Sequence, residues 1–140
     1  ADDHAPFLKT LREVLSLDPA VSVVAECSDG QQALARLRED DLDLAILDVE
    51  MPGMDGITVC GQLGQGSAAR VPRVIVLTLH EEPELQRRAR EAGVRGFVLK
   101  EHAVLDVLPA VHAVFAGRLY AGRQCAGFRE SYNKVEGTGG

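Results

Sequence analysis

The sequence predicts an α/β protein built on a parallel sheet with helices on both faces. Helix-like and strand-like segments alternate along the chain, which is typical of parallel strands connected by helices. Residues 44–47 form a short apolar run that ends at Asp48 and is followed by a turn at Pro52 and Gly53, as expected for a strand buried on both faces. Ligands in such sheets bind at the carboxyl ends of the strands, so Asp48 is a candidate reactive group.

Composition and charge exclude several classes of protein. The 140 residues predict one domain, and an apolar fraction of 46 % is enough for a hydrophobic core. The net charge of −6 argues against direct nucleic-acid binding, because contacts with phosphates need clustered lysine and arginine. No apolar run is long enough to span a membrane. The odd set of cysteines, Cys27, Cys60 and Cys125, with no signal peptide ahead of them, favours a reducing, cytoplasmic setting.

The amino-terminal part of the chain is expected to form helix, strand and helix ahead of the strand that ends at the candidate aspartate. Apolar side chains recur at helical spacing over residues 7–15, and Pro19 marks the end of this first helix. The valine-rich segment 21–27 has the composition of a strand. A turn at residues 28–30 can cap the next helix, whose apolar positions fall within residues 33–37.

The carboxyl-terminal part continues the alternation. Residues 56–65 favour a helix, weakened by its glycines. The apolar segment 71–77 is expected to be a strand, with its proline near the start, where proline is tolerated. Residues 81–92 begin with acidic side chains, which suit the positive end of a helix dipole. Residues 95–99 indicate a short strand, and residues 103–116 carry the apolar spacing of a last helix.

The pattern stops after that helix. Residues 121–140 are polar and rich in glycine, and they show no apolar period. We therefore expect residues 1–120 to form the folded domain and residues 121–140 to be a linker, a tag or a disordered tail.

Polar side chains stand at the ends of three predicted strands, at Asp48, Thr78 and Lys100, and Asp2 and Asp3 directly precede the first helix. Each of these residues alone has an ordinary structural explanation, but in a parallel sheet all of them can converge. Three carboxylates in one pocket repel each other, and Mg²⁺ relieves that repulsion. A lysine ammonium and a threonine hydroxyl can contact phosphoryl oxygens. This set suits phosphoryl transfer onto Asp48.

At this point the chain resembles the receiver domain of two-component response regulators. The matching residues are the Asp2-Asp3 pair, the stretch 47–56 with its Met-Pro-Gly-Met-Asp-Gly sequence, Thr78 and the stretch 96–100. The spacings from Asp48 to Thr78 and to Lys100 also agree with that family. The Asp-Asp-His opening, and a glutamate where many receivers have proline after the lysine, indicate the NarL/LuxR-type subfamily. The resemblance covers residues 1–120.

The resemblance implies a role for each acidic residue. Asp48 would accept a phosphoryl group from a histidine kinase. Asp2 and Asp3 would hold Mg²⁺ together with Asp48, and the backbone carbonyl of Glu50 would complete the protein ligands. Lys100 would contact the phosphoryl group.

The resemblance also implies a switch. Thr78 would move towards the phosphoryl group on activation. Phe97 occupies the position of an aromatic rotamer switch, which is tyrosine in many relatives, but phenylalanine cannot make the hydroxyl contact, and the pattern alone favours a buried core residue there. Glu50 and His80 stand where the family varies residues that tune dephosphorylation. The implied partners are a sensor kinase and, on activation, a second copy of the chain. The implied output is control of a DNA-binding domain, and the sequence has no room for such a domain.

The family fold is a flavodoxin-like doubly wound sheet with strand order 2-1-3-4-5, and the first strand of that order is absent from this sequence. Two explanations remain open: the strand was removed from this chain, or another segment fills its place. The chain is then an isolated receiver or a single-domain regulator.

Two other functions remain open at this point. A degenerate receiver would act only as a protein-interaction module. A haloacid-dehalogenase-type aspartyl-phosphate phosphatase also uses an aspartate nucleophile with Mg²⁺, but it usually has a second aspartate where this chain has Glu50. Apart from its own phosphorylation and dephosphorylation, the leading interpretation assigns no catalysis to the chain.

Overall fold

The computed structural model describes residues 4–21, 29–39, 42–51, 53–65, 72–125 and 127–128. In this part of the chain a single parallel sheet runs in the order β1-β2-β3-β4. Its strands are β1 (Leu44–Asp48), β2 (Arg73–Thr78), β3 (Gly96–Leu99) and β4 (Tyr120–Ala121). The first three strands were expected from the sequence, and the fourth was not.

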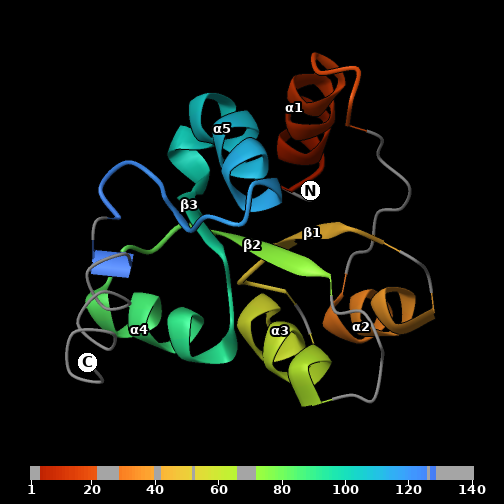
Figure 1. The fold of residues 1–140 in the computed structure, drawn as a ribbon, viewed down its shortest axis with the longest axis vertical. Coiled ribbons are helices and arrows are strands. Elements are labelled where there is room, and N and C mark those ends of the chain that lie inside the picture. Colours follow the sequence, from red (N-terminus) through yellow and green to blue (C-terminus); the bar gives the residue numbers. More distant parts are fainter. Residues whose placement is uncertain are drawn as a thin grey trace.

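Helices cover both faces of the sheet (Figure 1). They are α1 (His4–Ser16), α2 (Gly30–Glu39), α3 (Gly56–Gln65), α4 (Pro83–Ala92) and α5 (Ala103–Phe115), with a short 3-10 turn, η1 (Lys100–His102), ahead of α5. In Figure 1, α1 and α5 lie on one side of the strands, and α2, α3 and α4 lie on the other. This arrangement confirms the predicted flavodoxin-like α/β class.

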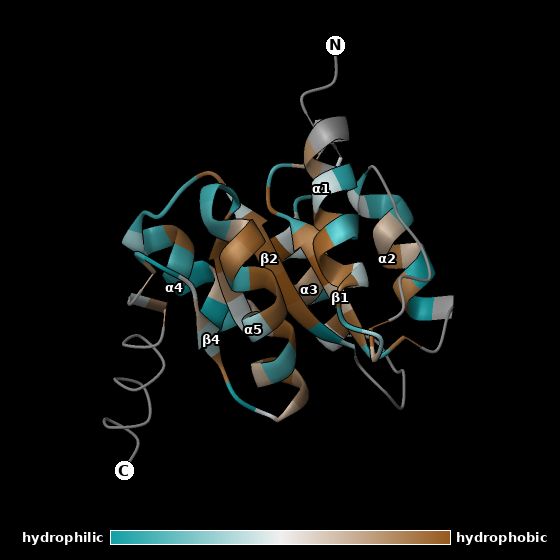
Figure 2. Cartoon of the chain, turned by 90° about the horizontal axis from the view of Figure 1, so that it is seen from above, coloured by the Kyte–Doolittle hydropathy of each residue, from teal (hydrophilic) through white to brown (hydrophobic). Residues whose placement is uncertain are grey.

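The core is built on β2, the strand with a neighbour on each side. Residues 74–77 are at most 2 % exposed. Ile75 and Leu77 pack with α1 and α5, whereas Val74 and Val76 pack with the helices of the opposite face. A strand covered on both faces needs this continuous apolar run, and Figure 2 shows the apolar residues concentrated on the strands.

The described strands account for part of the predicted sheet. β1, β2 and β3 follow one another as the third, fourth and fifth strands of the expected order do. The strand predicted over residues 21–27 lies outside the described residues, apart from Val21. Within the described ranges, no helix has the length and the apolar content that crossing a membrane requires.

The structure differs from the predicted domain boundary at residue 120. Ala121 belongs to β4, and the side chains of Cys125 and Phe128 are fully buried in the core. The packed part of the chain therefore reaches at least to Phe128. The apolar side chains of this segment follow neither a helical nor a strand period, because the segment is a short strand, then a turn, with residues 127 and 128 helical. Residues 129–140 lie outside the described part.

Candidate functional site

Three of the predicted site residues meet at one edge of the sheet. Asp48 is the last residue of β1, Thr78 is the last residue of β2, and Lys100 directly follows β3. The strands are parallel, with Asp48 opposite Leu77 and Thr78 opposite Leu99, so their carboxyl ends lie side by side. The sequence predicted this convergence, and the structure contains it.

Asp48 and Lys100 form the centre of the site. Lys100 Nζ lies 2.5 Å from Asp48 Oδ2, and the backbone N–H of Glu50 donates a hydrogen bond to Asp48 Oδ1 over 2.8 Å. The Lys100 side chain is only 8 % exposed, whereas that of Asp48 is 21 % exposed. A reagent can therefore approach the carboxylate while the ammonium group stays beneath the surface.

Glu50 lies between the other two groups. The Thr78 hydroxyl donates a hydrogen bond to Glu50 Oε2 over 2.7 Å, and the backbone N–H of Leu79 donates to Oε1 over 3.2 Å. Lys100 Nζ is 3.9 Å from the same Oε1. The Thr78 oxygen also accepts a hydrogen bond from the backbone N–H of His80 over 3.1 Å. The Glu50 side chain thus holds Thr78 and the start of the following loop against the site.

The loop after Asp48 returns sharply into α3, and glycine at position 56 permits that return. A Cβ atom at Gly56 would stand 2.6 Å from the carbonyl oxygen of Asp48, a distance that real side chains do not adopt. Asp55 caps the helix, since its Oδ1 accepts a hydrogen bond from the Thr58 N–H over 2.7 Å. The Asp-Gly pair therefore fixes the position of Asp48 relative to α3.

Phe7 is a neighbour of the site that the sequence did not single out. Lys100 Nζ lies 5.8 Å from the centre of the Phe7 ring, within the range of a cation–π contact. Phe7 was predicted as part of the apolar face of the first helix. Its closeness to Asp2 and Asp3 in the sequence is the signal that could have pointed to the site.

The other predicted site residues are Phe97, His80, Asp2 and Asp3. Phe97 is fully buried, and its ring centre is 5.7 Å from that of Phe128, so its side chain belongs to the core. The side chain of His80 is exposed and lies near Glu82, so His80 reaches Thr78 only through its backbone. Asp2 and Asp3 lie outside the described residues.

The described residues at this edge include oxygen atoms suited to binding Mg²⁺. Within the described ranges, no group of three or more histidine, cysteine, aspartate or glutamate side chains is arranged to hold a metal. Asp48 and the carbonyl of Glu50 supply the hard oxygen atoms that Mg²⁺ prefers, and they stand at the edge that the resemblance assigns to the ion. The donor chemistry of the residues present therefore fits the ion.

The fold and this edge define an α/β domain with a reachable carboxylate flanked by a lysine, a threonine and a second carboxylate. The model of the response regulator receiver domain family matches residues 1–112 of the chain. The chain belongs to this family.

The relatives indicate the subfamily. Over 119 residues the chain is 36 % identical to the transcriptional regulatory protein UhpA of Salmonella typhimurium, a match of 85 % of this chain and 58 % of UhpA. Over 119 residues it is 34 % identical to the nitrate/nitrite response regulator protein NarL of Escherichia coli, a match of 84 % of this chain and 54 % of NarL. The chain therefore spans little more than half the length of these curated relatives.

A solved structure also matches the fold of this chain. The crystal structure of a LuxR-family two-component response regulator from Aurantimonas sp. superimposes with a TM-score of 0.82 at 29 % identity, covering 94 % of this chain and 93 % of that chain. Together these matches support the NarL/LuxR subfamily.

Proposed function

We propose that the chain is a phosphoacceptor switch, in which Asp48 accepts a phosphoryl group from a sensor histidine kinase. The 2.5 Å contact between Lys100 Nζ and Asp48 Oδ2 is the observation that carries this proposal. It puts a fixed positive charge next to a carboxylate that is open to solvent, at the place where a phosphoryl oxygen would need to be neutralised.

The reaction needs positioning more than a separate catalytic base. A carboxylate oxygen of Asp48 attacks the phosphorus atom and an O–P bond forms. The N–P bond of the phosphohistidine breaks, and its ring, protonated at the other nitrogen, leaves with the electron pair as neutral imidazole. Lys100 stabilises the negative charge on the phosphoryl oxygens, and the hydroxyl of Thr78 can donate to one of them. The structural neighbours of Asp48 suit these roles.

Mg²⁺ is the proposed cofactor. Asp2, Asp3, Asp48 and the backbone carbonyl of Glu50 are the residues that would hold it. When bound, the ion would supply positive charge against the repulsion among these carboxylates and the incoming phosphoryl group.

The proposed switch begins at Thr78. Its hydroxyl donates a hydrogen bond to Glu50 in this structure, and a phosphoryl group on Asp48, at the end of the neighbouring strand, offers a more strongly charged acceptor. Phe97 is the proposed second switch residue. Glu50 and His80 are proposed to tune the lifetime of the phosphoryl group.

The proposed output is a changed surface that controls transcription through a partner or a homodimer. The curated relatives are regulators of transcription, whereas the net charge of −6 argues against direct contact of this chain with nucleic acid. A sensor kinase as partner and a transcriptional output both suit a protein that acts in the cytoplasm.

The experiment is a mass measurement of the intact protein before and after acetyl phosphate with Mg²⁺, using Asp48→Asn as the control. One added phosphoryl group in the wild type, and none in Asp48→Asn, is the expected result. A folded protein that gains no phosphoryl group would contradict the proposal and favour a degenerate receiver that only binds partners. Steady turnover of an external phosphate ester would favour a phosphatase instead.

A further inference from the structure

The chain folds back onto the sheet after α5. The N–H groups of Tyr120 and Gly122 donate hydrogen bonds to the carbonyls of Arg95 and Phe97 over 2.9 Å and 2.8 Å, which adds β4 in parallel to the edge of β3. In Figure 1 this part of the chain, drawn in blue, runs from α5 past β3 to the side of α4. We call residues 119–125, 127 and 128 the C-terminal strap.

A buried carboxylate on α5 anchors the strap. Asp106 is 1 % exposed, and its Oδ1 accepts a hydrogen bond from the Tyr120 hydroxyl over 2.9 Å. Its Oδ2 accepts a hydrogen bond from the backbone N–H of Arg123 over 2.9 Å, and Arg123 Nε lies 3.2 Å from Oδ1. Burying a carboxylate without such partners is costly, so the partners that the strap supplies are part of the stability of α5 in its present position.

At Gly122 the backbone of the strap packs closely against β3 and Asp106. A Cβ atom at Gly122 would stand 3.0 Å from the carbonyl oxygen of Phe97 and 3.1 Å from Asp106 Oδ2, so a larger residue would push the strap away from both. This glycine belongs to the stretch whose polar, glycine-rich composition predicted a tail.

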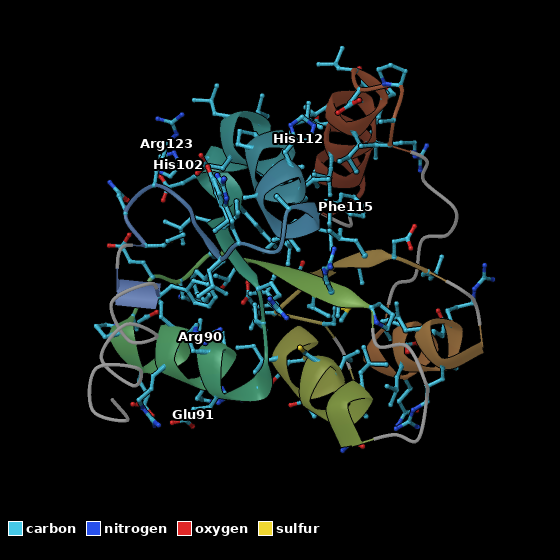
Figure 3. The ribbon with its side chains drawn as sticks, viewed as in Figure 1. Arg90, Glu91, His102, His112, Phe115 and Arg123 are labelled. Atoms are coloured by element: carbon cyan, nitrogen blue, oxygen red, sulfur yellow. The ribbon has the colours of Figure 1, made fainter. Side chains whose placement is uncertain are left out.

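Aromatic contacts fix the far end of the strap. Phe128 is fully buried, and its ring packs against Phe97 of β3 with the centres 5.7 Å apart. The guanidinium of Arg90 lies 5.5 Å from the centre of the Phe128 ring. Figure 3 shows Arg90 on the side of α4 that faces the sheet, and Glu91 on its outer side. The strap therefore contacts both β3 and α4.

The strap reaches the loop that follows Thr78. Residues 79–83, Gln86 and Glu101 line a hollow together with Gln124 and Gly127 of the strap. Gln86 is buried; its Nε2 donates a hydrogen bond to the carbonyl of Glu81 over 2.6 Å, and its Oε1 would be 2.8 Å from a Cβ atom at Gly127. Gln86 thus lies in contact with the loop and with the strap.

We propose that the C-terminal strap is a regulatory element: it covers the edge of β3 and the inner side of α4 while Asp48 is unmodified, and it loosens when Asp48 is phosphorylated. This inference rests on the proposed function. A phosphoryl group on Asp48 competes with Glu50 for the Thr78 hydroxyl, and Glu50 also holds the N–H of Leu79. Release of these bonds shifts the loop against Gln86, and Gln86 contacts the strap. The strap leads directly to residues 129–140, so its release would pass the state of Asp48 to the chain that follows.

Cysteine labelling can test this proposal in the full chain, because one thiol lies in the strap and another lies in α3. Cys125 and Cys60 are both buried, and burial raises the pKa of Cys125 to about 12 and that of Cys60 to about 11. Both thiols therefore react slowly while they stay covered. A maleimide reagent is added with and without acetyl phosphate and Mg²⁺, and the labelled peptides are quantified by mass spectrometry. Asp48→Asn receives the same treatment.

Phosphorylation is expected to raise the labelling rate of Cys125 at least about fivefold, the lower end of common coupling factors, while the rate of Cys60 stays unchanged. Asp48→Asn should show no change at either thiol. Equal Cys125 rates in phosphorylated and unmodified protein would overturn the proposal, and so would a rise at both thiols together. If no phosphoryl group is added at all, the proposed function fails and the coupling fails with it; an adduct without a change at Cys125 overturns the coupling alone.

A variant of Phe128 checks that the readout reports on the strap. Phe128→Leu keeps an apolar side chain and removes the ring contacts with Phe97 and Arg90. It should raise the labelling rate of Cys125 in unmodified protein. Because phosphorylated Asp48 favours the loosened state, a variant already shifted towards that state should also be phosphorylated to a greater extent at a given acetyl phosphate concentration. Faster labelling with an unchanged extent of phosphorylation would show a strap that is not coupled to the site, and would contradict the proposal.

Discussion

The Thr78 hydroxyl donates its hydrogen bond to the Glu50 carboxylate over 2.7 Å, so the threonine at the edge of the site is already bound to a negative group of the chain itself. Lys100 lies 2.5 Å from Asp48 and 3.9 Å from Glu50. The two carboxylates therefore share one lysine, and Glu50 alone holds the threonine. A phosphoryl group on Asp48 would compete with Glu50 for both.

Replacing Glu50 is expected to lengthen the life of the phosphoryl group on Asp48. In Glu50→Ala the Thr78 hydroxyl loses its present acceptor, and a negative charge near the phosphoryl group is removed. A net hydrogen-bond contribution of roughly 1 kcal/mol corresponds to a decay that is about fivefold slower. The decay is followed by intact-protein mass after the acetyl phosphate is removed.

Two further variants separate charge from hydrogen bonding at Glu50. Glu50→Gln keeps an acceptor for Thr78 without the charge, so a wild-type decay rate in this variant would assign the effect to the hydrogen bond. Glu13→Ala removes the same charge from the exposed face of α1 and should leave the decay rate unchanged. An unchanged rate in Glu50→Ala would rule out this role for Glu50.

Replacing Lys100 is expected to slow phosphorylation of Asp48. Lys100→Ala removes the group that lies 2.5 Å from the accepting carboxylate, and the rate of adduct formation should fall at least about tenfold. Lys100→Arg keeps the charge and should retain part of the rate. Lys9→Ala, on the exposed face of α1, is the matched control and should match the wild type. A wild-type rate in Lys100→Ala would contradict the proposed role.

Most of the fold and the centre of the site could be predicted because each depends on a local pattern. The apolar run before Asp48 marks a strand end, and the same holds for Thr78 and Lys100, so parallel pairing alone brings the three together. The sequence placed Glu50 near the site, but its hydrogen bond with Thr78 could not be predicted, because that contact depends on side-chain geometry across two separate strands. Phe7 was missed for a similar reason, since its approach to Lys100 depends on how α1 packs.

The C-terminal strap could not be predicted, because its stabilising contacts are distant in the sequence. Asp106 was expected to lie on a helix, and nothing in its neighbourhood predicts that the Tyr120 hydroxyl and the Arg123 N–H will bond it. Tyr120, Cys125 and Phe128 pack at irregular intervals, which neither a helical nor a strand period detects.

Removing the Asp106 carboxylate is expected to destabilise the whole domain. Asp106→Ala leaves the Tyr120 hydroxyl and the Arg123 N–H without their buried acceptor, at a cost of roughly 3 kcal/mol in the free energy of unfolding. Arg123→Ala removes an exposed side chain and should cost less than about 1 kcal/mol. Urea unfolding measures both. Similar losses in the two variants would mean that the carboxylate does not anchor the strap.

The contact between α5 and the end of α1 should depend on pH. His112 Nε2 lies 2.5 Å from Asp18 Oδ2, and Figure 3 shows His112 on the side of α5 next to α1. The hydrogen bond from His112, together with that from the Ala20 N–H, lowers the pKa of Asp18 below its usual value. A lowered carboxyl pKa stabilises the fold above the unfolded value of about 3.9, and this stability is lost as the pH falls through the folded value.

Asp18→Asn tests this contact, because it keeps the shape of the side chain and removes its charge. The variant should unfold at a lower temperature than the wild type at pH 6, and the gap should narrow as the pH falls below the unfolded value of about 3.9. His112→Ala should lose a similar amount at pH 6, and the double variant should lose no more than the larger single loss, since the two residues act as a pair. A gap that stays constant from pH 6 to pH 3, or losses that add fully in the double variant, would show that Asp18 and His112 stabilise the domain independently of each other.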